Sequence, residues 1–164
     1  SIKNIYTKVL KGHIAVAYTN LKLDNIGKKI DKRARKFLKK SNLDYAHGTG
    51  HGVGFFLNVH EGPQSISKLN QIKIKEGMIL SNEPGYYEKN NFGIRIENLV
   101  YIDSIEKNLI FKNLTFVPLE KDLIKINMLS KTEKDYLFNY CLETYYKLSP
   151  YLKENEKKWL ARLI

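Results

Sequence analysis

The histidines of this 164-residue chain are concentrated in one short glycine-rich segment that contains His47, His51 and His60. Gly48, Gly50, Gly52 and Gly54 alternate with the first two of them. In extended backbone alternate side chains share a face, so the two histidines would point one way and the glycines the other. A row of glycines weakens a strand, which predicts a close approach to the backbone there. One histidine would most simply cap a turn or be buried and hydrogen-bonded, but three beside such a row favour a functional site.

Two glutamates follow at places where a carboxylate is unexpected. Glu83 ends the apolar segment Met78–Leu80, immediately before Pro84 and Gly85. An unpaired carboxylate buried there would be costly, and a bound cation would relieve that cost.

Glu97 lies within an apolar segment, two residues after Arg95. Taken alone, it would most simply form a surface ion pair with Arg95, worth about 0–1 kcal/mol. Together, however, His51, Glu83 and Glu97 make a hard, oxygen-rich ligand set that suits manganese, cobalt or zinc. A carboxylate can bridge two such ions roughly 3.5–4 Å apart, where they activate water.

The hydrophobic pattern predicts an α+β chain in one domain, with helices packed on a mainly antiparallel sheet. The expected helices cover residues 2–18, the segment from Asp24 to Leu38, and the segment from Thr132 with a break at Pro150; the expected strands cover residues 53–59, 78–80, 94–102 and 109–119. The second helix carries a solvent-facing row of lysines: Lys28, Lys29, Lys32, Lys36, Lys39 and Lys40.

Composition excludes several classes of protein. Hydrophobic residues at 43% are typical of a soluble globular chain, and no apolar run reaches the roughly 20 residues that span a bilayer. Cys141 is the only cysteine, which excludes a disulfide within the chain and suits the reducing cytoplasm. The net charge of +11 could indicate nucleic-acid binding, but there are only four arginines and the lysines are dispersed. We therefore expect a solvated basic surface and no nucleic-acid partner.

Three ordered motifs resemble those of the pita-bread metallopeptidases, and most closely the Xaa-Pro aminopeptidases (aminopeptidase P). They are HGTGHGVGFFLNVHEGP from His47, EGMILSNEPGYY from Glu76, and FGIRIENLV from Phe92. The segment LKGHIAVA from Leu10 and the C-terminal tail are also similar, so the resemblance covers nearly the whole chain. It implies the pita-bread fold, with a curved, mainly antiparallel sheet and helices packed on it.

The resemblance also implies roles for individual residues. His51 and Glu83 would bind one metal and Glu97 would bridge both, with two manganese ions as the expected cofactors and a bridging hydroxide as the nucleophile. His60 would bind the peptide carbonyl and support proton transfer, and His47 would line the pocket for proline. Tyr87 and Arg95 would orient the substrate. The expected substrates are peptides with proline at the second position, and the expected assembly is a homodimer.

The sequence departs from the family pattern at two aspartates that should precede the first helix. None of its six aspartates has that context. We therefore expect residues 1–164 to be the C-terminal part of a single catalytic domain whose aspartate-bearing upstream segment is absent. The alternative is a member that has lost catalysis. On its own the chain should bind metal weakly and have negligible activity, with the upstream part of the same polypeptide as its partner.

Three rival functions stay open at this point. A prolidase or a methionine aminopeptidase would share the fold. A non-catalytic pita-bread module would bind peptides or proteins without turnover. A lysine-rich nucleic-acid binder ranks last and would show steeply salt-dependent affinity.

Overall fold

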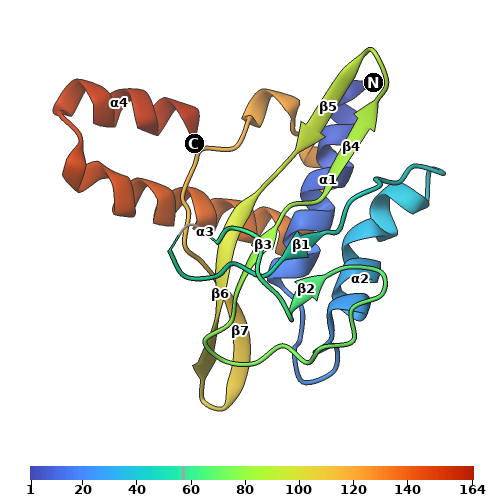
Figure 1. Cartoon of the computed structure of the whole chain (residues 1–164). Coiled ribbons are helices and arrows are strands. Elements are labelled where there is room, and N and C mark those ends of the chain that lie inside the picture. The colour runs from blue at the N-terminus through green and yellow to red at the C-terminus, as the bar shows by residue number, and fades with distance from the viewer. Residues whose placement is uncertain (57) are drawn as a thin grey trace. The chain divides into compact units, whose positions relative to one another are not determined.

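The computed structural model describes residues 1–56 and 58–164, which form two compact units. The larger unit is Lys8–Leu114, and the smaller combines Ser1–Thr7 with Thr115–Ile164. The first helix, α1 (Ile2–Ala17), contributes to both (Figure 1). In the described part of the chain, no helix is both long and apolar enough to cross a membrane.

In the larger unit, α1 is joined by α2 (Gly27–Lys39), and both confirm the predicted helices. Helix α2 buries Ile30, Ala34 and Leu38, while its five lysines and the C-cap Lys40 are exposed, as the pattern predicted. A side chain at Gly12 would place its Cβ 2.6 Å from the Ala34 carbonyl oxygen, so the two helices pack with backbone almost in contact.

The strands of this unit pair only in antiparallel fashion within the described residues, which confirms the predicted fold class. They are β1 (Gly50–His51), β2 (Ser65–Ile66), β3 (Ile79–Asn82), β4 (Gly85–Glu88), β5 (Phe92–Arg95), β6 (Asn98–Ile105) and β7 (Asn108–Asn113). They form the sheets β1-β2, β3-β6-β7 and β4-β5. The core joins the sheets β1-β2 and β3-β6-β7 to the helices through ten buried side chains: Val16, Leu21, Ile30, Ala34, Ile66, Ile74, Leu80, Val100, Ile102 and Phe111.

Three strand predictions were wrong in their extent. The described residues of the segment 53–59 form a loop, because the chain reverses at Phe56, whose φ is 48°; Leu57 lies outside the described residues. The strand expected over 94–102 is interrupted between Arg95 and Asn98, and the sequence pattern does not predict β4, which directly follows Pro84. The strand over 109–119 ends at Asn113.

The smaller unit contains α3 (Lys131–Leu148) and α4 (Glu154–Leu163), with the short 3-10 helices η1 (Lys121–Leu123), η2 (Ile126–Met128) and η3 (Ser149–Tyr151). Ser130 and Glu133 form a capping box that begins α3. Tyr140 on α3 holds the preceding segment, since its hydroxyl donates to the Val117 carbonyl at 2.9 Å. The helix–break–helix prediction for the tail is confirmed, with the break at Pro150.

Candidate functional site

Glu83 and Glu97 face each other at the one interruption of a long antiparallel pair. Asn82 pairs with Asn98 where β3 meets β6, and Gly85 pairs with Arg95 where β4 meets β5. Both pairs belong to the same antiparallel register, and continuing it by one residue from Asn82 and Asn98 places Glu83 opposite Glu97. Like charges directly opposite on neighbouring strands destabilise a sheet, so this arrangement calls for a cation.

His51 joins the two carboxylates from the neighbouring sheet. Its backbone N–H donates to the Ser81 Oγ at 2.9 Å, and that hydroxyl donates to Glu83 Oε1, also at 2.9 Å. The ring Nδ1 lies 3.0 Å from the Gly52 carbonyl, which can only accept, so Nδ1 carries the proton and Nε2 presents its lone pair. His51 Nε2 lies 3.4 Å from Glu83 Oε1. Ligand atoms of His51, Glu83 and Glu97 all lie within 4.8 Å of one another.

The close approach predicted from the glycine row is made by the chain's own backbone. A Cβ at Gly50 would lie 1.9 Å from the Ser81 carbonyl oxygen, and one at Gly52 would lie 2.0 Å from that of Glu61. Only glycine allows the segment to pass so near β3, and this proximity brings His51 to Glu83. Within the described residues only Gly50 and His51 of this segment are strand, so the glycines serve packing and not an extended ladder.

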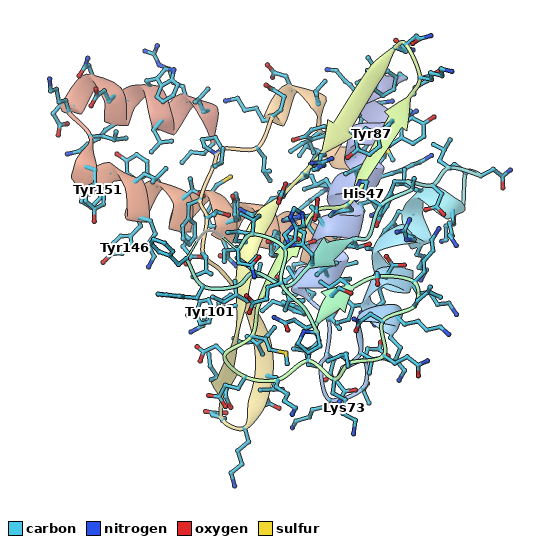
Figure 2. All side chains as sticks on the ribbon, viewed as in Figure 1. His47, Lys73, Tyr87, Tyr101, Tyr146 and Tyr151 are labelled. Atoms are coloured by element: carbon cyan, nitrogen blue, oxygen red, sulfur yellow. The ribbon has the colours of Figure 1, made fainter. Side chains whose placement is uncertain are left out.

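A second group of predicted residues forms a hydrogen-bonded chain beside the carboxylates. Arg95 Nε donates to the Tyr87 hydroxyl at 2.8 Å, and this hydroxyl lies 2.9 Å from His47 Nε2. Because His47 Nδ1 donates to the Gly48 carbonyl at 2.6 Å, its Nε2 can accept the Tyr87 proton. Figure 2 shows His47 and Tyr87 side by side. The hydrogen bond to Tyr87 raises the pKa of Arg95, whose Nε also lies 3.9 Å from Glu83 Oε2.

The remaining predicted residue, His60, lies against the ring of His51. The ring centroids are 4.0 Å apart, the ring planes are tilted by 40°, and His60 is exposed. Arg95 also differs from the simplest expectation from the sequence, which was a surface ion pair with Glu97. Its ion-pair partner in the structure is Glu83.

Sequence reasoning missed the buried polar residues behind this site. Asp31, Arg35 and Thr49 are each at most 2% exposed, and they form hydrogen bonds to one another or to the histidine segment. The sequence does contain one indication of this cluster, because Asp31 and Arg35 are four residues apart and adjoin the apolar positions of α2.

The donor set fits divalent cations. A metal-binding histidine usually donates its other ring N–H to a carbonyl or carboxylate, as His51 does to the Gly52 carbonyl. Two opposed carboxylates supply oxygen ligands whose mutual repulsion a cation would remove.

Residues 1–104 match Metallopeptidase family M24, and residues 107–163 match the C-terminal region of peptidase M24. The chain belongs to metallopeptidase family M24.

Within that family it is similar to Xaa-Pro aminopeptidases. It is 46% identical to Aminopeptidase P2 of Arabidopsis thaliana, over 96% of this chain and 24% of that protein. The X-prolyl aminopeptidase of Caenorhabditis elegans, described as a cytosolic enzyme with a di-nuclear active site, matches with a TM-score of 0.90 at 36% identity, over 99% of this chain and 28% of that one. The prolidase of Pyrococcus horikoshii matches with a TM-score of 0.61 at 32% identity, over 74% of this chain and 33% of that one. The chain thus spans about a quarter of the length of the curated relatives it matches. These likenesses confirm the predicted resemblance and the pita-bread fold.

Proposed function

We propose that this chain supplies part of the active site of a two-metal aminopeptidase that cleaves the bond between an N-terminal residue and a following proline. The convergence of His51, Glu83 and Glu97 within 4.8 Å carries this proposal. The likeness to Xaa-Pro aminopeptidases over nearly the whole chain supports the choice of substrate.

In this proposal His51 and Glu83 would hold one cation, and Glu97 would be a ligand of both cations. Bound divalent cations at such a site would supply Lewis acidity and lower the pKa of water. His60, exposed beside His51, would donate to the carbonyl oxygen of the scissile bond. His47 would contact the proline side of the substrate, with its tautomer set by Gly48 and its orientation by Tyr87.

Three side chains provide too few ligands for two hard divalent cations. We propose that two aspartates come from an upstream part of the same polypeptide, which this chain would complete as the C-terminal part of one catalytic domain. The chain alone would then bind metal weakly and be nearly inactive.

Proline specificity has a chemical basis, since the proline nitrogen of an Xaa-Pro bond carries no amide hydrogen. A pocket that recognises this bond must therefore rely on the shape of the ring rather than on a hydrogen bond to that nitrogen. His47 and Tyr87, whose rings lie edge to face at 5.4 Å between centroids, offer flat surfaces for such a contact.

Manganese as the metal and a homodimeric assembly stay predictions. A cytoplasmic location is supported by the described cytosolic relative and by the single cysteine.

The test uses the complete polypeptide that contains this chain, reconstituted with manganese. We expect it to release the first residue of a tripeptide with proline second and to leave the matching tripeptide with alanine second intact. Glu97→Gln should lower turnover by at least about a thousandfold while the protein stays folded, because a bridging carboxylate would be lost. A Glu97→Gln enzyme as active as the wild type would refute the assignment.

The rivals give different results in the same assay. A prolidase would cleave Xaa-Pro dipeptides and spare tripeptides, and a methionine aminopeptidase would act on peptides that begin with methionine and lack proline. A non-catalytic module would bind the proline tripeptide without turnover and would contain no stoichiometric metal.

A further inference from the structure

A buried arginine lies behind the histidine segment, with its guanidinium almost fully engaged. Arg35 of α2 is 2% exposed, and its Nε donates to Asp31 Oδ2 at 2.8 Å. One Nη donates to Asp44 Oδ1 at 2.6 Å, and the guanidinium stacks on the Tyr45 ring, 3.8 Å from its centroid. Burial alone would lower the pKa of Arg35, but the hydrogen bonds and charges of its acidic neighbours outweigh this and raise it. The cation is therefore fixed in charge and in place.

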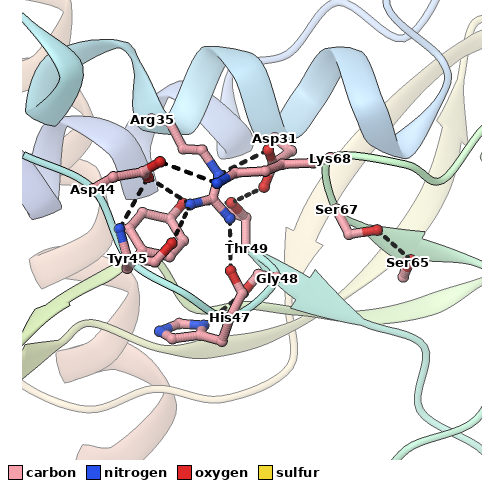
Figure 3. Close-up of polar contacts among 10 residues, drawn as sticks. All are labelled: Asp31, Arg35, Asp44, Tyr45, His47, Gly48, Thr49, Ser65, Ser67 and Lys68. Carbon is pink, nitrogen blue, oxygen red and sulfur yellow. Dashed lines mark hydrogen bonds and ion pairs between the residues drawn. The ribbon is translucent and has the colours of Figure 1, made fainter.

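The same guanidinium holds the backbone that leads into the proposed site. Nη1 donates to the Tyr45 carbonyl at 2.7 Å, and Nη2 donates to the His47 carbonyl at 2.6 Å. Figure 3 shows the guanidinium enclosed by these acceptors. A planar fork that bonds two carbonyls two residues apart fixes the direction of the chain between them, so it also fixes where the His47 side chain leaves the backbone.

Asp31 extends the support from His47 two residues further along the segment, to Thr49. It accepts from Arg35 and, through Oδ1, from the Thr49 hydroxyl at 2.7 Å. Thr49 is fully buried, and its hydroxyl also contacts that of Tyr45. The segment from Tyr45 to Thr49 is thus attached to α2 at three positions.

The proposed metal ligands have supports of their own. His51 is held by the pairing of β1 with β2 and by Ser81, and Glu83 and Glu97 are placed by the register of the long strand pair. The segment 45–49 adds one bond to this support, from the Glu83 N–H to the Thr49 carbonyl at 2.8 Å. Loss of Arg35 should therefore disturb His47 much more than it disturbs the cation ligands.

We propose that Arg35 is a positioning residue that fixes His47 for contact with the proline side of the peptide. This inference rests on the proposed function and deepens it, because it separates the support of the peptide subsite from that of the metal ligands.

The test compares Arg35→Gln with Arg33→Gln in the complete manganese-loaded polypeptide. Arg33 is the matched control, since it lies on the same helix and also pairs with an aspartate, Asp24 at 3.0 Å, but on the exposed side. We expect Arg35→Gln to raise KM for the proline tripeptide by about tenfold, with kcat and the metal stoichiometry nearly unchanged. Arg33→Gln should leave all three values at those of the wild type.

Two further measurements separate positioning from general damage. In a His47→Ala background, Arg35→Gln should change KM by less than about twofold, because the side chain it positions is gone. Hydrogen exchange of peptides covering residues 44–51 should be faster in Arg35→Gln than in Arg33→Gln, with α2 still protected. If Arg35→Gln does not fold, Thr49→Val removes only the hydroxyl that donates to Asp31, and it should raise KM in the same direction by a smaller factor.

Several outcomes would overturn the inference. Unchanged exchange over residues 44–51 would show that Arg35 does not order the segment. An equal rise in KM with and without His47 would show that Arg35 acts elsewhere, and parallel loss of metal and peptide binding would show a general structural role. A wild-type polypeptide that does not cleave Xaa-Pro bonds would refute the proposed function, whereas the exchange measurement would still decide the role of Arg35 in ordering His47.

Discussion

Replacing Gly50 with alanine should test whether the close passage of β1 along β3 creates the candidate metal site. The added Cβ would lie 1.9 Å from the Ser81 carbonyl oxygen, whereas real Cβ contacts are essentially never below 3.0 Å. The two backbones would have to separate by about 1 Å to relieve this overlap.

That separation would break two specific hydrogen bonds. The His51 N–H to Ser81 Oγ bond, at 2.9 Å, and the Glu83 N–H to Thr49 carbonyl bond, at 2.8 Å, would both stretch beyond bonding distance. Each is worth about 0.5–1.5 kcal/mol, and the overpacking itself costs about 1–3 kcal/mol. The free energy of unfolding of the unit Lys8–Leu114 should therefore fall by about 2–6 kcal/mol.

The functional loss should exceed what reduced stability explains. A shift of about 1 Å between His51 and Glu83 should weaken manganese binding and lower kcat/KM by about a hundredfold in the complete polypeptide. Manganese titration by calorimetry and tripeptide hydrolysis, both at a temperature where the variant is folded, would measure the two effects. Gly62→Ala is the control, since nothing lies within 4 Å of its added Cβ. Wild-type metal affinity and stability in Gly50→Ala would show that the close passage does not position the ligands.

Three shorter predictions concern neighbouring groups. Tyr87→Phe removes the hydroxyl between Arg95 and His47 and should lower kcat/KM by about tenfold, whereas an unchanged value would show that this chain of hydrogen bonds is dispensable. Burial lowers the pKa of His13 from 6.5 to about 4, so between these pH values the unfolded state binds more protons than the folded state. The free energy of unfolding should therefore decrease as the pH is lowered through that range. Unfolding measured at pH 7 and pH 5 should show a loss of about 2 kcal/mol that is absent in His13→Gln, and an equal loss in the variant would exclude this histidine as the cause. For Asp44, burial would raise the pKa, but hydrogen bonds and charges from Arg35 and Lys68 outweigh this and lower the pKa to about 2. Its contribution to stability should therefore disappear as the pH falls from about 4 to about 2. The free energy of unfolding of Asp44→Asn should depend less on pH in that range.

The sequence predicted α2 well because this helix has a clear apolar face. Ile30, Ala34 and Leu38 recur at helical spacing in α2, and the lysines fall on the opposite side. The strands were predicted less well, since β1 and β2 have two residues each and show no measurable alternation. Their place is set by contacts distant in sequence, such as the bridge between Gly52 and Leu80.

The convergence of His51, Glu83 and Glu97 was predicted, and their ligand atoms do lie within 4.8 Å of one another, but the placement of the two carboxylates opposite each other could not be predicted. Motif resemblance singled out His51, Glu83 and Glu97, whereas only the pairing of Asn82 with Asn98 and of Gly85 with Arg95 shows that the carboxylates are opposed. Arg35 was overlooked because it stands in a run of basic residues that are otherwise exposed. Its burial depends on acceptors from a segment ten or more positions further along the chain.

The two-stranded ribbon β4–β5 carries both Tyr87 and Arg95, and within the described residues it pairs with no other strand. The ribbon continues the pairing of β3 with β6, and the Ile96 N–H donates to the Pro84 carbonyl at 3.3 Å between the two pairs, but a two-stranded ribbon of this size has little stability of its own in water. Its orientation therefore also depends on polar groups that would receive a peptide, namely His47 and Glu83. Peptide binding and ordering of the ribbon should consequently be coupled in free energy. A bound peptide should slow hydrogen exchange of the ribbon's amides. Substitutions in the distant turn at Asn90 should change peptide affinity although this turn does not contact the peptide.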